Sequence, residues 1–213
     1  MFLEKCLDLL VNLITALLLF LIPWVWYQYF SKIPLKGYFV KTKKNFISNR
    51  NYYKIGFSPN GEDHFENFES MGIVAIGWPK IGTLDKLVGA DENTIREEVR
   101  SRIKNEYPQI ESSITIGQIA GYFVKFLSIK QGDIIVTTRN QQLYIYEVTG
   151  TYSYRDVKDH TAHRIEIDTK GKTMVPLNDS SDISPKFKRA AQNRLTIISL
   201  NEYATQIEML INQ

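Results

Sequence analysis

The chain has 213 residues, and its 26 lysine and arginine side chains only slightly outnumber its 23 aspartate and glutamate side chains. The excess of basic side chains is confined to one segment: residues 31–61 hold seven basic and no acidic side chains, whereas residues 62–213 hold 18 basic and 21 acidic ones. Strong non-specific binding of nucleic acid requires many uncompensated basic groups, so residues 62–213 as a whole do not belong to that class. The single cysteine, Cys6, excludes an internal disulfide and a zinc site of several cysteines, and it fits a reducing cytoplasm.

A membrane-spanning helix is the first predicted element. Residues 9–30 are an uncharged run of 22 residues, long enough to cross about 30 Å of hydrocarbon as a helix. The end of the run carries aromatic side chains typical of the headgroup level: Trp24, Trp26, Tyr27 and Tyr29. The alternative, a cleaved signal peptide, expects a basic start, a shorter apolar core and a small-residue cleavage site. We therefore predict that residues 1–30 are a retained transmembrane anchor, with membrane lipid as partner and a homo-oligomer through the helix as a further option.

Residues 31–50 are predicted to be a basic juxtamembrane linker. Seven basic side chains follow the anchor before the first acidic residue, Glu62: Lys32, Lys36, Lys41, Lys43, Lys44, Arg50 and Lys54. Basic residues remain on the cytoplasmic side of a membrane helix. We therefore predict a single-pass protein of the cell inner membrane whose C-terminal part faces the cytoplasm.

Residues 51–213 have the size of one ordinary domain, and strand and helix patterns alternate along them. The pattern predicts, in chain order, a strand at 52–57, a turn at 58–61, a short helix at 62–70 and a buried strand at 73–78. Helical spacing returns at 93–105, with Asn93 as the expected cap, and again at 115–127.

An antiparallel hairpin is the clearest predicted feature of this domain, with strands at 133–138 and 143–149 flanking a turn at 139–142. The remaining expected elements are strands at 152–154, 164–168, 174–175 and 195–200, and a closing helix at 202–211. Five or more short strands with helices between them predict an α+β fold around a small, strongly curved or closed sheet.

The order of five sequence segments resembles the PUA-like superfamily, in particular the EVE-like domains of Mrr- and McrB-type modification-dependent restriction proteins. The segments are YYKIGFSPNG at 52–61, GIVAIGW at 72–78, IGQIAGYFVKFLSIKQGDIIVTT at 116–138, YIYEVTGTYSY at 144–154 and HRIEI at 163–167. The resemblance covers the whole of residues 51–213. It implies a transmembrane helix followed by a PUA/EVE-like small β-barrel with flanking helices.

The resemblance also implies a pocket that takes a nucleobase, often a modified one, between aromatic side chains. Stacking of a base on an aromatic face is worth about 1 to 3 kcal/mol, and hydrogen bonds to the base edge then discriminate. The candidate ligand-binding residues at the matching positions are Ser58, Trp78, Gln118, Tyr122, Tyr152, Tyr154 and His163. Each aromatic candidate also has a structural interpretation, as core packing or a surface ladder, and His163 has one as a cross-strand partner.

One dense basic patch could contact a nucleic-acid backbone or be a solvated helix face: Lys186, Lys188, Arg189 and Arg194. The chain lacks a Walker A loop, a nucleophile elbow and a zinc-protease helix, so no catalytic residue, cofactor or metal is predicted. Residues 168–170, Asp-Thr-Lys, are the weak basis for a nuclease hypothesis, although Asp and Lys are also ordinary turn residues.

Three functions follow from these observations. The first is a membrane-anchored module that recognises a nucleobase or nucleotide, as a sensor or effector in bacterial defence. The second is a membrane-tethered scaffold for protein interactions that retains a PUA-like fold without a ligand. A nuclease comes third. Aromatic candidates gathered around a concave pocket would favour the first function, and the same rings packed into a core would favour the second.

Overall fold

A five-stranded sheet in the order β7-β4-β3-β1-β8 forms the centre of the computed structural model, which describes residues 50–58, 61–178 and 182–213. Its strands are β1 (Tyr52–Ile55), β3 (Ile134–Arg139), β4 (Gln142–Glu147), β7 (Thr173–Pro176) and β8 (Ile197–Ser199). Strands β1 and β3 pair in parallel, and the other neighbours are antiparallel. The predicted anchor at 1–30 and nearly all of the linker lie outside the described residues. Within the described ranges, no helix has the length and apolar character required to cross a membrane.

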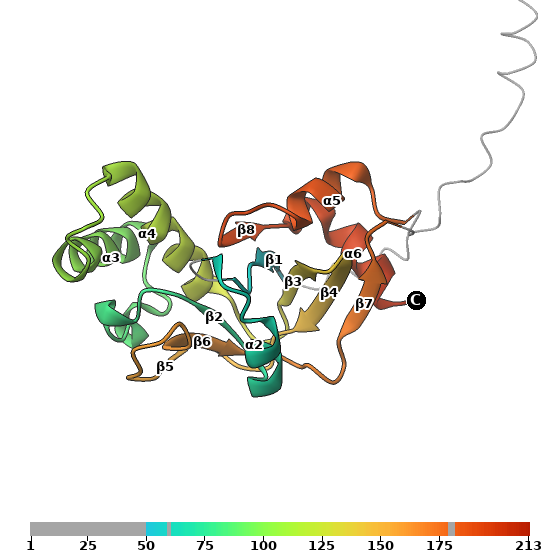
Figure 1. Cartoon of the computed structure of the whole chain (residues 1–213), viewed down its shortest axis with the longest axis horizontal. Coiled ribbons are helices and arrows are strands. Elements are labelled where there is room, and N and C mark those ends of the chain that lie inside the picture. Colours follow the sequence, from blue (N-terminus) through green and yellow to red (C-terminus); the bar gives the residue numbers. More distant parts are fainter. Residues whose placement is uncertain (1–49, 59–60, 179–181) are drawn as a thin grey trace, which may run out of the picture. The chain divides into compact units, whose positions relative to one another are not determined.

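Both faces of this sheet are buried, because its strands carry apolar side chains on both sides. In β4, Leu143 and Ile145 pack with helices α5 (Pro185–Ala191) and α6 (Ala204–Ile211). The alternate side chains, Tyr144 and Tyr146, belong to the second core on the opposite face. Figure 1 shows α5 and α6 beside β3, β4 and β7, with the α3–α4 pair at the other end of the structure.

A three-stranded sheet contains β2 (Ile73–Ile76), β6 (His163–Glu166) and β5 (Ser153–Tyr154) in the order β2-β6-β5. It meets the large sheet through a single bridge between Val148 and Ile167. The α+β class is therefore confirmed, whereas the prediction of a closed small β-barrel is wrong for the described residues. The physical reason is that β5 has only two residues and the outer strands β7 and β8 have no strand pairing that would close the large sheet.

Helices α3 (Glu92–Glu106) and α4 (Ser113–Ser128) pack against each other, and their buried residues recur at helical spacing (Figure 1). The N-terminus of α3 is capped by the side chain of Asp91, which accepts from two backbone N–H groups, and not by the expected Asn93. Helix α2 (Phe65–Met71) ends at Gly72, whose φ of 65° is a left-handed cap conformation. The 3₁₀ turns η2 (Pro79–Ile81), η3 (Asp85–Leu87) and η4 (Asn201–Tyr203) were not predicted from the sequence.

The antiparallel hairpin of β3 and β4 confirms the sequence prediction, although its strand ends differ by one or two residues from the predicted 133–138 and 143–149. Arg139 pairs with Gln142, and the two residues between them, Asn140 and Gln141, have φ of 50° and 60°. Positive φ at both central positions gives a type I′ turn, which matches the twist of the flanking strands.

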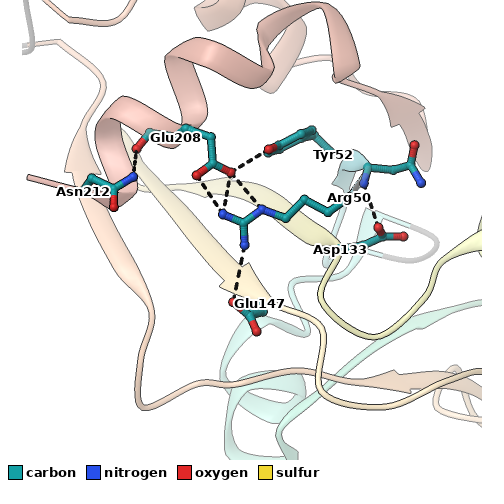
Figure 2. A network of polar contacts seen from close by, with 7 residues as sticks. Arg50, Tyr52, Asp133, Glu147, Glu208 and Asn212 are labelled. Atoms are coloured by element: carbon teal, nitrogen blue, oxygen red, sulfur yellow. Dashed lines mark hydrogen bonds and ion pairs between the residues drawn. The ribbon is translucent and has the colours of Figure 1, made fainter. Parts of the chain in front are cut away.

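A partly buried carboxylate, that of Glu208, fastens the start of the described domain to its C-terminal helix (Figure 2). The guanidinium of Arg50 donates to both carboxylate oxygens of Glu208 on α6, at 2.6 to 2.9 Å. The hydroxyl of Tyr52 donates to the same carboxylate at 2.6 Å. Close by, the backbone N–H of Asn51 donates to the buried carboxylate of Asp133, which fixes the entry into β1.

Replacing Glu208 with Gln is expected to lower the free energy of unfolding by about 2 kcal/mol, because charge-assisted hydrogen bonds are lost while the shape is kept. Urea denaturation of the full-length chain in mild detergent measures the change. Glu202→Gln, at an exposed position on η4, is the matched control and should change stability by less than about 0.5 kcal/mol. Equal midpoints for the two variants would contradict the role of Glu208.

Candidate functional site

A cleft of about 1180 Å³ lies where the ends of several strands meet. Residues that follow or end β1, β2 and β3 line it: 56–58, 77–80 and 137–138. Loops complete the walls, from residues 106–110 after α3, residues 156–160 between β5 and β6, and residues 192–196 between α5 and β8. Strand ends and loops position polar groups on a rigid frame, which is where proteins commonly place ligand sites.

Three aromatic side chains on the cleft wall are tied together around η2: Trp78, Tyr107 and Tyr154. The backbone N–H of Lys80 donates to the Tyr107 hydroxyl at 3.1 Å, and the Lys80 ammonium lies 5.6 Å from the Tyr107 ring centre. The Tyr154 hydroxyl donates to the carbonyl of Pro79 at 3.4 Å. The three rings therefore belong to one wall although they come from distant parts of the sequence.

Trp78 has an unusual backbone conformation, with φ of 69° and ψ of 51°. A bulky side chain in the left-handed region is rare and costs about 1 to 3 kcal/mol, so this conformation persists only where the surrounding structure imposes it. Its ring packs against Tyr122 and Phe123 of α4, with centroid separations of 6.2 and 5.9 Å, and remains half-buried on the cleft wall. The packing holds the indole in place without removing it from the cleft.

A chain of largely buried hydrogen bonds supports this backbone conformation. The Trp78 carbonyl can only accept, so the Nε2–H of the fully buried His163 donates to it, at 3.1 Å. The neutral ring then accepts at Nδ1 from the Tyr152 hydroxyl at 2.8 Å, and the Tyr152 oxygen accepts from the Leu84 N–H at 3.1 Å. Burial lowers the pKa of His163 to about 4 and raises the pKa of Tyr152, so both groups stay neutral near pH 7.

Basic groups occupy another part of the cleft. Lys54 of β1 is only 5% exposed, and its Nζ donates to the carbonyl of Leu195 at 2.7 Å. Burial lowers the pKa of Lys54 to about 8. The described cleft lining contains four cationic side chains, Lys54, Lys80, Lys158 and Arg194, against two carboxylates, Glu106 and Asp156. The cleft therefore favours ligands that carry negative charge.

Four of the residues predicted from sequence line this cleft: Ser58, Trp78, Tyr154 and Arg194. Tyr152 and His163 lie behind the wall, in the hydrogen-bond chain that supports Trp78. Tyr122 packs against Trp78 from α4, and Gln118 is exposed on the same helix without lining the cleft.

The predicted basic patch is divided by the structure. Lys186 and Arg189 are exposed on α5, and the Lys188 ammonium donates to the side-chain oxygen of Asn178 at 2.5 Å. Only Arg194, in the loop after α5, lines the cleft. The four residues therefore do not form one continuous surface within it.

Sequence reasoning did not single out Lys54, Tyr107 or His160 as cleft residues. The signal for Lys54 was present, because it is a lysine inside an otherwise apolar strand and shares a strand face with the buried Tyr52. Tyr107 directly follows the last residue of α3, and the local sequence carries no sign of its place in the cleft.

The segment behind the nuclease hypothesis lies in the connection between β6 and β7. The Asp168 carboxylate accepts from the backbone N–H groups of Lys170 and Gly171, and these bonds lower its pKa. This is the arrangement of an Asp-stabilised turn. In the part of the chain that the structure describes, no three His, Cys, Asp or Glu side chains are placed to hold a metal ion.

Compared with family models, curated proteins and solved structures, the chain has no match. The function is therefore inferred from the geometry of the cleft and from the sequence segments described above.

Proposed function

We propose that the chain is a membrane-anchored module that binds a nucleobase-containing ligand in the cleft, as a sensor or effector in bacterial defence. The observation that carries the proposal is the gathering of Trp78, Tyr107 and Tyr154 on one wall of a cleft that also contains Lys54 and Arg194. Aromatic faces provide stacking for a base, and cationic groups favour an anionic ligand. The resemblance of residues 51–213 to EVE-like domains supports the same ligand class.

The membrane part of the proposal rests on residues 1–50, with a single anchor at 9–30 and a basic flank that places the domain in the cytoplasm. In this arrangement the cleft samples cytoplasmic nucleotides or nucleic acid at the membrane surface. Ligand binding would then act on assembly of the anchors.

A protein-interaction scaffold is the second candidate. It is favoured by the internal roles of Tyr152 and His163, whose polar atoms bond to the protein itself. A scaffold requires no ligand in the cleft, so the two candidates differ in whether Trp78 contributes to binding. A catalytic role is the least supported, because Asp168 is used by a turn.

Trp78→Ala is expected to weaken ligand binding by about 5- to 150-fold, because base stacking is worth about 1 to 3 kcal/mol. The backbone strain is unchanged, since alanine at φ of 69° is strained as tryptophan is. Trp78→Phe keeps an aromatic face and should retain most of the affinity. Calorimetry on the full-length chain in mild detergent measures binding of 5′-mononucleotides and their base-methylated forms.

The matched control is Tyr203→Ala, which removes a half-buried ring that packs on Phe187, outside the cleft. This variant should bind as the unmodified chain does. A chain that binds no mononucleotide, methylated nucleotide or short single strand at millimolar concentration would leave the scaffold as the supported function.

A further inference from the structure

The amine of Lys54 is a buried cation on the cleft wall, without a counter-charge among the residues that the structure describes. Its Nζ uses one of three N–H donors, on the Leu195 carbonyl, and no carboxylate among the described residues forms an ion pair with it. Gly56 leaves the space beside the amine open, since a Cβ at that position would lie 3.3 Å from Nζ. With respect to the described residues, two N–H donors of Lys54 thus remain for a group that enters the cleft.

Burying an unpaired ammonium is unfavourable, and folds usually pair such a charge or expose it. The carbonyl of Leu195 does not require a charged donor, because a neutral donor or water would satisfy it equally. An amine kept in this position with a lowered pKa is therefore typical of a binding or reactive site.

Two of the four cleft cations, Lys54 and Arg194, come from segments other than the aromatic wall, whereas Lys80 lies beside the Tyr107 ring. Lys54 is bonded to the loop 192–196, which also supplies Arg194, whereas the aromatic wall is bonded around Pro79. The cleft carboxylates adjoin the aromatic wall in sequence: Glu106 is the last residue of α3, directly before Tyr107, and Asp156 lies two residues after Tyr154. A ligand with an aromatic end and an anionic end matches this division.

We propose that the cleft binds a nucleotide in preference to a nucleoside, with Lys54 and Arg194 holding the phosphate while the aromatic wall takes the base. This inference rests on the proposed function and specifies the chemical class of its ligand. The phosphate is a monoester of a free nucleotide or the terminal phosphate of a strand, and both offer the same oxygens to Lys54.

The bound phosphate stabilises the charged form of Lys54, so binding near pH 8 is accompanied by proton uptake. Above that pH the free protein loses the Lys54 charge, and the affinity for nucleotide should fall by about tenfold between pH 7.5 and 9.5. The other ionisable groups that line the cleft are Lys80, Glu106, Tyr107, Tyr154, Asp156, Lys158, His160 and Arg194. Their contribution is measured by the same pH series on Lys54→Met. In this variant the part of the decrease in nucleotide affinity that is due to Lys54 should be absent.

The test is calorimetry on the full-length chain in mild detergent, with 5′-mononucleotides and the matching nucleosides as probes. Lys54→Met should weaken nucleotide binding by about 10- to 100-fold, the range for a charged hydrogen bond, and leave nucleoside binding within about twofold. Lys86→Met, at an exposed lysine on η3 outside the cleft, should change the affinity for neither the nucleotide nor the nucleoside. A mononucleotide and a 5′-phosphorylated single-stranded hexanucleotide distinguish a free nucleotide from a strand end.

Equal loss of nucleotide and nucleoside binding in Lys54→Met, or no loss of either, would overturn the role of Lys54 and leave the proposed function in place. Equal affinity of the unmodified chain for nucleotide and nucleoside would also overturn the role of Lys54 and leave the proposed function in place. Absence of binding for every probe would overturn both proposals. If Lys54→Met does not fold, the pH series on the unmodified chain decides, because only nucleotide affinity should fall above pH 8.

Discussion

Acidification from pH 7 to pH 4 should lower the free energy of unfolding by about 3 kcal/mol through His163 alone. In the fold, burial lowers the pKa of this imidazole to about 4, whereas an unfolded chain has the ordinary value of about 6.5. Between these two values the unfolded state binds the additional proton. Stability is therefore fully present above pH 6.5 and is lost as the pH falls towards 4. Protonation would also place a second donor opposite the Tyr152 hydroxyl, which can no longer donate to Nδ1.

The measurement is urea denaturation of the full-length chain at pH 7, 5.5 and 4.5, compared with His163→Gln. Glutamine can still donate to the Trp78 carbonyl but does not titrate, so this variant should lack the His163 part of the acid loss. His64→Gln, at a half-buried histidine in contact with Phe68, is the control for histidine loss in general. If the free energy of unfolding depends on pH in the same way for the unmodified chain and for His163→Gln, His163 is not the cause of the loss of stability in acid.

Lys54→Met should raise the free energy of unfolding at pH 7 by about 2 kcal/mol, even though it removes a buried residue. A decrease in pKa from about 10.5 to about 8 corresponds to about 3 kcal/mol of unfavourable charge burial. Loss of the hydrogen bond to the Leu195 carbonyl reduces the gain in stability by about 1 kcal/mol. Between pH 8 and 10.5 the unfolded state binds more protons than the fold. The stability of the unmodified chain therefore rises with pH through this window, and the advantage of Lys54→Met shrinks.

Thermal and urea unfolding at pH 7 and pH 9.5 measure this difference, with Lys86→Met as the exposed control that should stay within about 0.5 kcal/mol. A variant that is more stable but binds nucleotide less well would show that Lys54 is retained for binding at the expense of stability. If Lys54→Met is less stable than the unmodified chain at pH 7, the amine contributes to the fold and the charge argument fails.

Local sequence patterns determined the elements of this domain whose partners are near in the chain. The hairpin turn at 139–142 was predictable because the flanking strands are adjacent and Asn140 tolerates positive φ. Helices α3 and α4 were predictable because Ile95, Val99 and Ile103, and a similar set in α4, recur on one helical face. In each case the signal lies within about 15 residues.

Tertiary structure alone decided how the strands combine. Strands β1 and β3 pair in parallel although about 80 residues separate Tyr52 from Ile134, and no local pattern specifies that partner. The same short strands are compatible with a closed barrel or with two open sheets. The choice depended on the bridge at Val148 and Ile167 and on the packing of α5 and α6 against the large sheet.

Tertiary structure also decided which side chains line the cleft. The sequence identified Trp78 and Tyr154 as aromatic residues near strand ends, and the structure brings both to the cleft with Tyr107. It could not distinguish Tyr154 from Tyr152, two residues apart, because exposure of an aromatic ring depends on what packs against it. A lysine in a strand is ordinarily an exposed residue, and only the loop that folds over Lys54 makes it a buried cation. Local propensity thus set the elements, whereas non-local packing set which side chains share the cleft.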